Sequence, residues 1–172
     1  GGAEQGDADV QAEAFVAAVR DLEDPPAIKV FEDRWEEQKL WQVRESGLGA
    51  TANVPGRQPA HPGWEDSAVP PDQVGSYLRE LRSLLDEFGY DAALYGHYGQ
   101  GCIHCRITFD LHSVHGVRQW MEFLSRAADL VVAHGGSLSG EHGDGQARAA
   151  LLGRMYSDEL IAAFGEYADI WD

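Results

Sequence analysis

Apolar residues recur at helical spacing in several parts of the chain. The clearest stripe lies in 71–88 and is followed by Gly89, a residue that commonly ends helices. It consists of Val74, Tyr77, Leu78, Leu81, Leu84, Leu85 and Phe88. A second stripe predicts a helix over 114–133, with Val117, Trp120, Met121, Leu124, Ala128 and Val131 facing inward. Each helix therefore has one face to bury.

Weaker patterns predict the remaining elements. Helices are expected over 10–22, where Pro25-Pro26 follows as a stop, and over 32–47, 146–155 and 157–171. A short strand is expected over 27–31. The Gly- and Pro-rich segment 48–71 is expected to be a long irregular connection with a strand at 64–69. Residues 1–8 look like a tail.

Strict alternation of apolar and polar residues over 103–111 predicts a strand with one buried face. A tight turn at Gln100-Gly101 would pair it with the preceding residues from Asp91, and in that register His97 faces His104. Directly opposed residues have Cβ atoms about 4.5–5.5 Å apart, so the two imidazoles could share one metal ion. The alternative is an ordinary hairpin with two surface histidines.

The adjacent strands of this hairpin favour an α+β fold over a parallel sheet. We expect an antiparallel sheet with helices packed on one face, in a ferredoxin-like cap, forming a single domain over 1–172. A glycine-rich loop at 135–145 contains Glu141 and His142, which are candidates for further ligands. The alternative for this loop is a turn that only leads into a helix.

The net charge and the cysteine content exclude several classes of protein. The chain has 172 residues with 13 Lys and Arg against 29 Asp and Glu, a formal charge of −16, so its surface repels nucleic acid and anionic lipid. No apolar run reaches the ~18 residues of a membrane helix. Two cysteines are too few for a disulfide scaffold, which favours a cytoplasmic protein. Cys102 lies on the His104 face of the strand and would border the site, whereas Cys105 faces the core.

Two arginines could grip a substrate carboxylate through their forked guanidinium groups. Arg44 lies in a predicted helix, and Arg106 lies beside His104 on the polar face of the strand. The alternative for Arg44 is a solvated side chain paired with an acidic neighbour.

Two motifs resemble the signatures of the FAD-linked oxidase C-terminal domain. They are Gly96-His-Tyr-Gly-Gln-Gly-Cys-Ile-His104 and Gly135-Gly-Ser-Leu-Ser-Gly-Glu-His-Gly-Asp-Gly145. The segments 40–45 and 65–70 also resemble landmarks of that family, which includes D-lactate dehydrogenases, D-2-hydroxyglutarate dehydrogenases and the flavin subunit of glycolate oxidase. The residues of both motifs are most similar to those of the branch of the family that is fused to a downstream iron–sulfur domain.

The resemblance implies specific roles. His97, His104 and Glu141 match positions that hold a divalent metal, commonly zinc. His142 matches the general base, and Arg44 matches the arginine that binds the substrate carboxylate. The stretch Glu141, His142 and Gly143 would line the flavin.

This sequence also departs from the family pattern. Cys102 stands where many relatives have a substrate-facing Asn, Gln100 replaces a common Asp, and Trp64 lies near the place of a substrate-binding Lys in some relatives. These departures leave the particular hydroxy acid open.

The implied function is the substrate- and metal-binding domain of a flavin-dependent dehydrogenase that oxidises a D-2-hydroxy acid. We expect an excised fragment, inactive alone, whose parent chain supplies an FAD-binding domain upstream and a 4Fe-4S domain downstream. The parent would be cytoplasmic or attached peripherally to a membrane, with no nucleic-acid partner. The alternatives are a metal-dependent hydrolase with Glu141 or His142 as the base, and a non-catalytic docking module.

Overall fold

The computed structural model describes residues 4–31 and 33–171, without the side chains of Gln5, Arg44, Leu48 and Ala50. It divides into two units, 1–46 and 47–172, which are described separately. The first contains α1 (Gln5–Arg20) and the start of α2 (Arg34–Ala52). Helix α1 takes in part of the expected tail, of which residues 1–3 lie outside the described range.

Asp33 caps the N-terminus of helix α2 and so determines where the helix begins. The Asp33 carboxylate accepts the backbone N–H groups of Trp35 at 2.8 Å and Glu36 at 3.1 Å, which satisfies two free donors of the first turn. The strand expected over 27–31 is wrong for the described residues 27–31, which have no regular secondary structure. Helix α2 also continues five residues beyond 47 and shortens the expected irregular connection.

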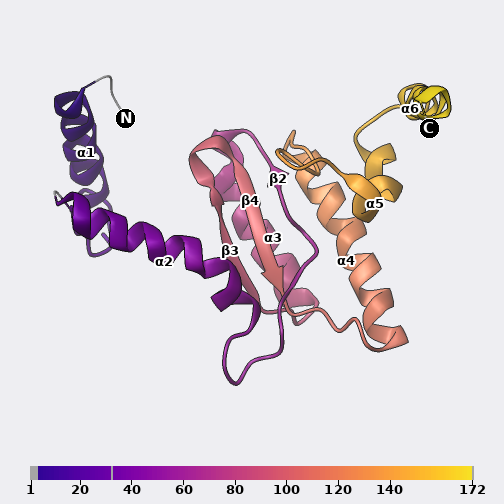
Figure 1. Ribbon diagram of the computed structural model, residues 1–172, viewed down its shortest axis with the longest axis horizontal. Coiled ribbons are helices and arrows are strands. Elements are labelled where there is room, and N and C mark those ends of the chain that lie inside the picture. The colour runs from indigo at the N-terminus through magenta and orange to yellow at the C-terminus, as the bar shows by residue number, and fades with distance from the viewer. Residues whose placement is uncertain (1–3, 32, 172) are drawn as a thin grey trace. The chain divides into compact units, whose positions relative to one another are not determined.

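The second unit contains an antiparallel sheet built around β4 (Cys102–Ile107), with helices on one face (Figure 1). Strand β3 (Ala92–His97) pairs with one edge of β4. The other edge pairs in succession with β1 (His61–Pro62) and β2 (Ser67–Ala68). The expected α+β class with an antiparallel sheet is confirmed.

Helices α3 (Val74–Glu87) and α4 (Val114–Ala133) pack against each other and bury most of their apolar stripes against the sheet. Met121, which was expected to face inward, is 61% exposed. Odd-numbered residues of β4 point into this core. The fully buried set is Trp64, Tyr77, Leu81, Ile103, Cys105, Ile107, Phe123, Ala127, Ala128, Val131 and Leu138. The expected helix over 114–133 is confirmed at both ends. Its start is fixed by Ser113, whose hydroxyl accepts the Gly116 N–H at 2.9 Å.

The chain after the glycine-rich loop is helical. Helix α5 (Gly145–Arg148) runs into a 3₁₀ turn (Ala149–Arg154), and α6 (Asp158–Trp171) follows. A further 3₁₀ turn (Pro71–Gln73) precedes α3. No helix among the described residues is long and apolar enough to cross a membrane.

The predicted hairpin register is wrong by two residues. His97 pairs with Cys102, and Tyr95 pairs with His104. The reason is the loop, which is a 3₁₀ turn at 98–100 closed by Gly101 at φ 81° and not a two-residue turn at Gln100-Gly101. Because side chains alternate with a period of two, a slip of two leaves every residue on its predicted face. His97 and His104 therefore remain diagonal neighbours on the same face.

Candidate active site

Three predicted ligands converge above the β3–β4 face. The His97 and His104 rings lie 5.9 Å apart between centroids at an interplanar angle of 80°. The Glu141 Oε1 atom lies 3.4 Å from His104 Nε2 and 3.6 Å from His97 Nε2. His104 is nearly buried, with 7% exposed, whereas about half of the His97 side chain is exposed. One carboxylate oxygen thus faces two ring nitrogens from neighbouring strands.

The glycine-rich loop brings Glu141 to the sheet. Ser137 forms an antiparallel bridge with Ala68 of β2, with N–O distances of 2.7 and 3.0 Å. The Gly140 N–H then donates to the Asp66 carbonyl at 2.8 Å. A Cβ at Gly140 would lie 2.7 Å from the Ala68 Cβ, so the loop can come this close only because that residue has no side chain.

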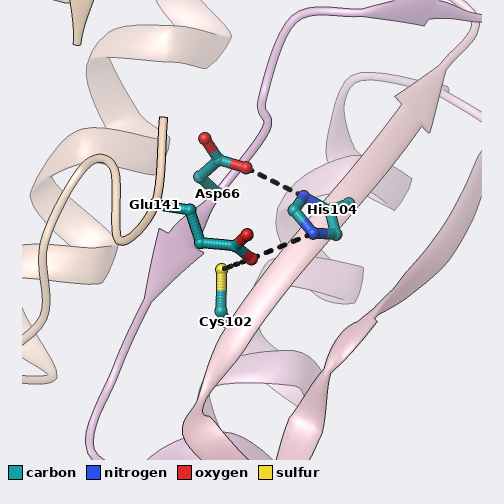
Figure 2. Close-up of side chains that lie close together, drawn as sticks. All are labelled: Asp66, Cys102, His104 and Glu141. Carbon is teal, nitrogen blue, oxygen red and sulfur yellow. Dashed lines mark hydrogen bonds and ion pairs between the residues drawn. The ribbon is translucent and has the colours of Figure 1, made fainter. Parts of the chain in front are cut away.

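Asp66 lies near Nδ1 of the His104 ring, and Glu141 lies near Nε2 of the same ring (Figure 2). Four residues, 63–66, lie between β1 and β2, while only His104 and Cys105 lie between the corresponding pairs of β4. The extra residues bulge over the ring, and Asp66 adopts φ 61° within this bulge. Its Oδ1 atom lies 2.9 Å from His104 Nδ1. The bulge therefore supplies an acidic neighbour at His104 Nδ1, and the glycine-rich loop supplies Glu141 at Nε2.

His142 shares the same aspartate. Its Nδ1 atom lies 2.7 Å from Asp66 Oδ2, and its backbone N–H donates to that oxygen at 3.1 Å. The His142 ring stacks on His104 with centroids 5.9 Å apart, and most of its side chain is exposed. The predicted base therefore lies beside the predicted ligands, with Nε2 turned away from Asp66.

Cys102 lies at the floor of the site (Figure 2). Its thiol donates to Glu141 Oε1 at 3.2 Å. Burial, followed by this bond and the charge of Glu141, raises the Cys102 pKa to about 12. The same bond and the neighbouring imidazoles lower the pKa of Glu141. Cys102 is a protonated donor to the carboxylate in this arrangement, and Cys105 is buried in the core as predicted.

Arg106 is close to the site but is held by other groups. Its Nη1 atom lies 3.8 Å from Glu65 Oε1, and its side chain is mostly buried. Glu65 Oε2 also lies 3.3 Å from His104 Nδ1, and burial raises the pKa of Glu65. The side chain of Arg44 lies outside the described residues; its backbone is in α2. Gly143 has φ 81° in the exposed tip of the loop.

The donor set fits a divalent metal. Zinc binds histidine nitrogen and carboxylate oxygen at about 2.0–2.2 Å, and two such ligands at a tetrahedral angle lie about 3.4 Å apart. The distances of 3.4 and 3.6 Å to Glu141 Oε1 match that spacing. A different group, without His97, consists of Asp66, Cys102, His104 and Glu141, whose ligand atoms, one from each residue, lie within 4.8 Å of one another. We favour the set with His97, because Asp66 Oδ1 faces His104 Nδ1, whereas Glu141 Oε1 lies near the Nε2 atoms of both His104 and His97.

Asp66 and Arg148 are two buried charged residues at the site that were not identified from the sequence. Asp66 is 1% exposed and Arg148 is 7% exposed. The Arg148 guanidinium donates a hydrogen bond to the Leu138 carbonyl at 2.6 Å and lies over the Trp64 ring. It thereby links the glycine-rich loop to the core. The acidic pair at 65–66 in a Gly- and Pro-rich segment was a usable signal for Asp66. Arg148 had no such signal, because it lies in an unremarkable helical stretch.

The chain is similar to several known proteins. A D-2-hydroxyglutarate dehydrogenase of Pantoea ananatis is 32% identical over 72% of this chain, which corresponds to 12% of that relative. A D-lactate dehydrogenase of Archaeoglobus fulgidus is 31% identical over 55% of this chain and 21% of its own length. A glycolate oxidase subunit of Bacillus subtilis is 23% identical over 81% of this chain and 29% of its own length. The chain thus spans only a fraction of these relatives. Residues 2–172 match the family described as FAD linked oxidases, C-terminal domain, and the chain belongs to that family.

Proposed function

We propose that this chain is the substrate- and metal-binding domain of a flavin-dependent dehydrogenase that oxidises a D-2-hydroxy acid. The observation that carries the proposal is the convergence of His97, His104 and Glu141 beside a fourth group, His142. The family match and the names of the relatives support the flavin and the class of substrate. Because the chain covers a fraction of these proteins, the activity belongs to a larger assembly that includes an FAD-binding domain.

The chemistry divides among the residues as follows. Flavin, when bound, supplies the acceptor for the hydride of the hydroxy acid. A divalent ion such as zinc, when held by His97, His104 and Glu141, supplies a Lewis acid that lowers the pKa of the substrate hydroxyl. His142 takes the hydroxyl proton at Nε2, since Nδ1 faces Asp66. Arg44 binds the carboxylate of the substrate.

The charges around the site also favour a cation. Glu65, Asp66 and Glu141 surround His104. Among the described residues, the cations near these three carboxylates are Arg106, beside Glu65, and the buried Arg148, which interacts with Glu65 and Asp66. A site with this excess of carboxylates repels an anionic hydroxy acid. A bound divalent ion offsets that excess and gives the substrate oxygen atoms a partner. The metal is therefore required both for acid–base chemistry and for affinity.

The surrounding parent protein is part of the same proposal. We expect an FAD-binding domain upstream, whose flavin meets Glu141, His142 and Gly143, and a downstream 4Fe-4S domain that passes electrons onward. We expect the parent to be cytoplasmic or attached peripherally to a membrane. The coding sequence on either side of this chain tests both neighbouring domains.

Metal binding by the chelator-treated chain tests the site itself. We expect zinc or manganese to bind with a stoichiometry of about one, and His97→Ala and His104→Ala to weaken binding by at least tenfold. His112→Ala, an exposed histidine away from the site, is the matched control. Addition of a D-2-hydroxy acid should alter the absorption of the cobalt form more than the L-enantiomer does. Equal binding by all four proteins would contradict the proposal, and flavin-free turnover of simple esters would favour the hydrolase alternative.

A further inference from the structure

We propose that Asp66 is a positioning residue that fixes the tautomers of both His104 and His142. In both rings Nδ1 carries the proton and Nε2 keeps its lone pair. His104 then offers its lone pair to the metal, and His142 offers its lone pair to the substrate hydroxyl. These consequences rest on the proposed function, whereas the tautomers themselves depend only on this chain.

The two oxygens of Asp66 face two different rings. Oδ1 lies 2.9 Å from His104 Nδ1, and Oδ2 lies 2.7 Å from His142 Nδ1. The opposite nitrogen of each ring faces Glu141, with His104 Nε2 at 3.4 Å from Oε1 and His142 Nε2 at 3.8 Å from Oε2. One carboxylate thus lies at the Nδ1 atoms of the two rings, and another lies near their Nε2 atoms.

The chemistry of a carboxylate decides the tautomer. An ionised aspartate only accepts hydrogen bonds, so a neutral imidazole that contacts it through Nδ1 must hold its proton there. The remaining nitrogen, Nε2, is then the base or the ligand. A carboxylate behind a ligating histidine is the usual partner that orients the ring. Asp66 would perform this role for a ligand and a base at the same time.

Asp66 is held firmly enough for this role. It is 1% exposed, Ser139 Oγ lies 3.3 Å from its Oδ2, and its backbone carbonyl accepts the Gly140 N–H. Among the described residues it is the one non-glycine residue with positive φ, at 61°. Its Oδ1 accepts no well-aligned hydrogen bond from the described residues. His104 Nδ1, at 2.9 Å, is the nitrogen that this buried acceptor faces, so a proton on Nδ1 is the donor that the geometry offers it.

Glu65 provides a matched comparison. Its Oε2 lies 3.3 Å from His104 Nδ1 and its side chain is mostly buried, but no contact with His142 is seen among the described residues. Glu65→Gln therefore changes the neighbouring carboxyl group at His104 Nδ1 without touching the link between Asp66 and His142. If the role is specific to Asp66, the tautomer of His142 should change in a variant of Asp66 and stay the same in Glu65→Gln.

Long-range proton–nitrogen NMR of the imidazoles tests the inference directly. In the metal-free, flavin-free chain at about pH 8, above the reference pKa of about 6.5 of a free imidazole, we expect both His104 and His142 to hold their proton at Nδ1 and not at Nε2. Asp66→Asn has one acceptor oxygen and one donor group, so at least one ring should change to the Nε2-protonated tautomer. Zinc affinity should fall about 10–100-fold. Glu65→Gln should leave the tautomer of His142 unchanged.

The outcomes separate this inference from the proposed function. Nε2 protonation of either ring in the unmodified chain would overturn the inference, even if Asp66→Asn failed to fold. Unchanged tautomers in a folded Asp66→Asn variant would also overturn it. Correct tautomers in a chain that binds no metal would support the role of Asp66 and count against the proposed metal site.

Discussion

The close contact between Gly140 and Ala68 gives a quantitative test of how the glycine-rich loop positions Glu141. In Gly140→Ala the new Cβ would lie 2.7 Å from the Ala68 Cβ, whereas carbon atoms pack at about 3.5–4.0 Å. The loop must therefore move by about 1 Å. Its outer side is exposed, so we expect a stability cost of about 1 kcal/mol, at the low end for overpacking.

The effect on the site should exceed the effect on stability. Glu141 follows Gly140 directly, and a shift of about 1 Å separates its Oε1 from His97 and His104. We expect zinc affinity to fall about tenfold. Isothermal titration measures the affinity, and urea denaturation measures the free energy of unfolding. Gly153→Ala, whose Cβ meets no heavy atom within 4 Å, should change neither.

A second substitution tests the cause. Ala68→Gly removes the atom that the new Cβ meets, so Gly140→Ala/Ala68→Gly should recover most of the affinity, with a coupling energy of about 1 kcal/mol. Ala68→Gly alone should cost about 0.5–1 kcal/mol in stability, as glycine does in a strand. Unchanged affinity in Gly140→Ala, or no recovery in the double variant, would refute the steric argument.

Three further expectations follow from buried or charged groups of the second unit. Tyr77→Phe should lower the free energy of unfolding, measured by urea denaturation, by about 1–3 kcal/mol. The reason is that the Tyr77 hydroxyl accepts a hydrogen bond from Trp64 Nε1 at 3.0 Å and donates one to Ser67 at 2.8 Å. A change below about 0.3 kcal/mol would argue against this network. Iodoacetamide should modify Cys102 at least about tenfold more slowly in the native than in the unfolded chain at pH 8, since its pKa is raised to about 12; equal rates would contradict that shift. The pKa of Glu141 is lowered, so its charge stabilises the fold above its ordinary pKa and loses this effect as the pH falls. The difference in unfolding free energy between the chain and Glu141→Gln should therefore be constant above about pH 5 and shrink below it, and a difference that grew at low pH would be inconsistent with the shift.

Local rules were sufficient for much of the fold. The apolar stripes of α3 and α4 depend on residues within each helix, so both helices could be predicted from the pattern, and α4 at both of its ends. The face of β4 that carries His104 was also predictable, because it depends only on alternation. The hairpin register was not, because Gly101 allows a longer loop that the sequence does not distinguish from a two-residue turn.

Other features depend on contacts between distant segments. Residues 27–31 have apolar character but no strand beside them in the described part of their unit. The role of Asp66 arises from a bulge that forms only when β1 and β2 both pair with β4. The burial of Arg148 depends on Trp64 and Leu138, which lie in different segments. Such placements follow from tertiary packing and leave little trace in local patterns.

The anomalous diffraction of a zinc-soaked crystal tests the central claim most directly. We predict one peak bonded to His97 Nε2, His104 Nε2 and Glu141 Oε1, with Asp66 behind His104 and outside the coordination sphere. A peak bonded to Asp66 and Cys102 instead of His97, or no peak at this site at saturating zinc, would contradict the account.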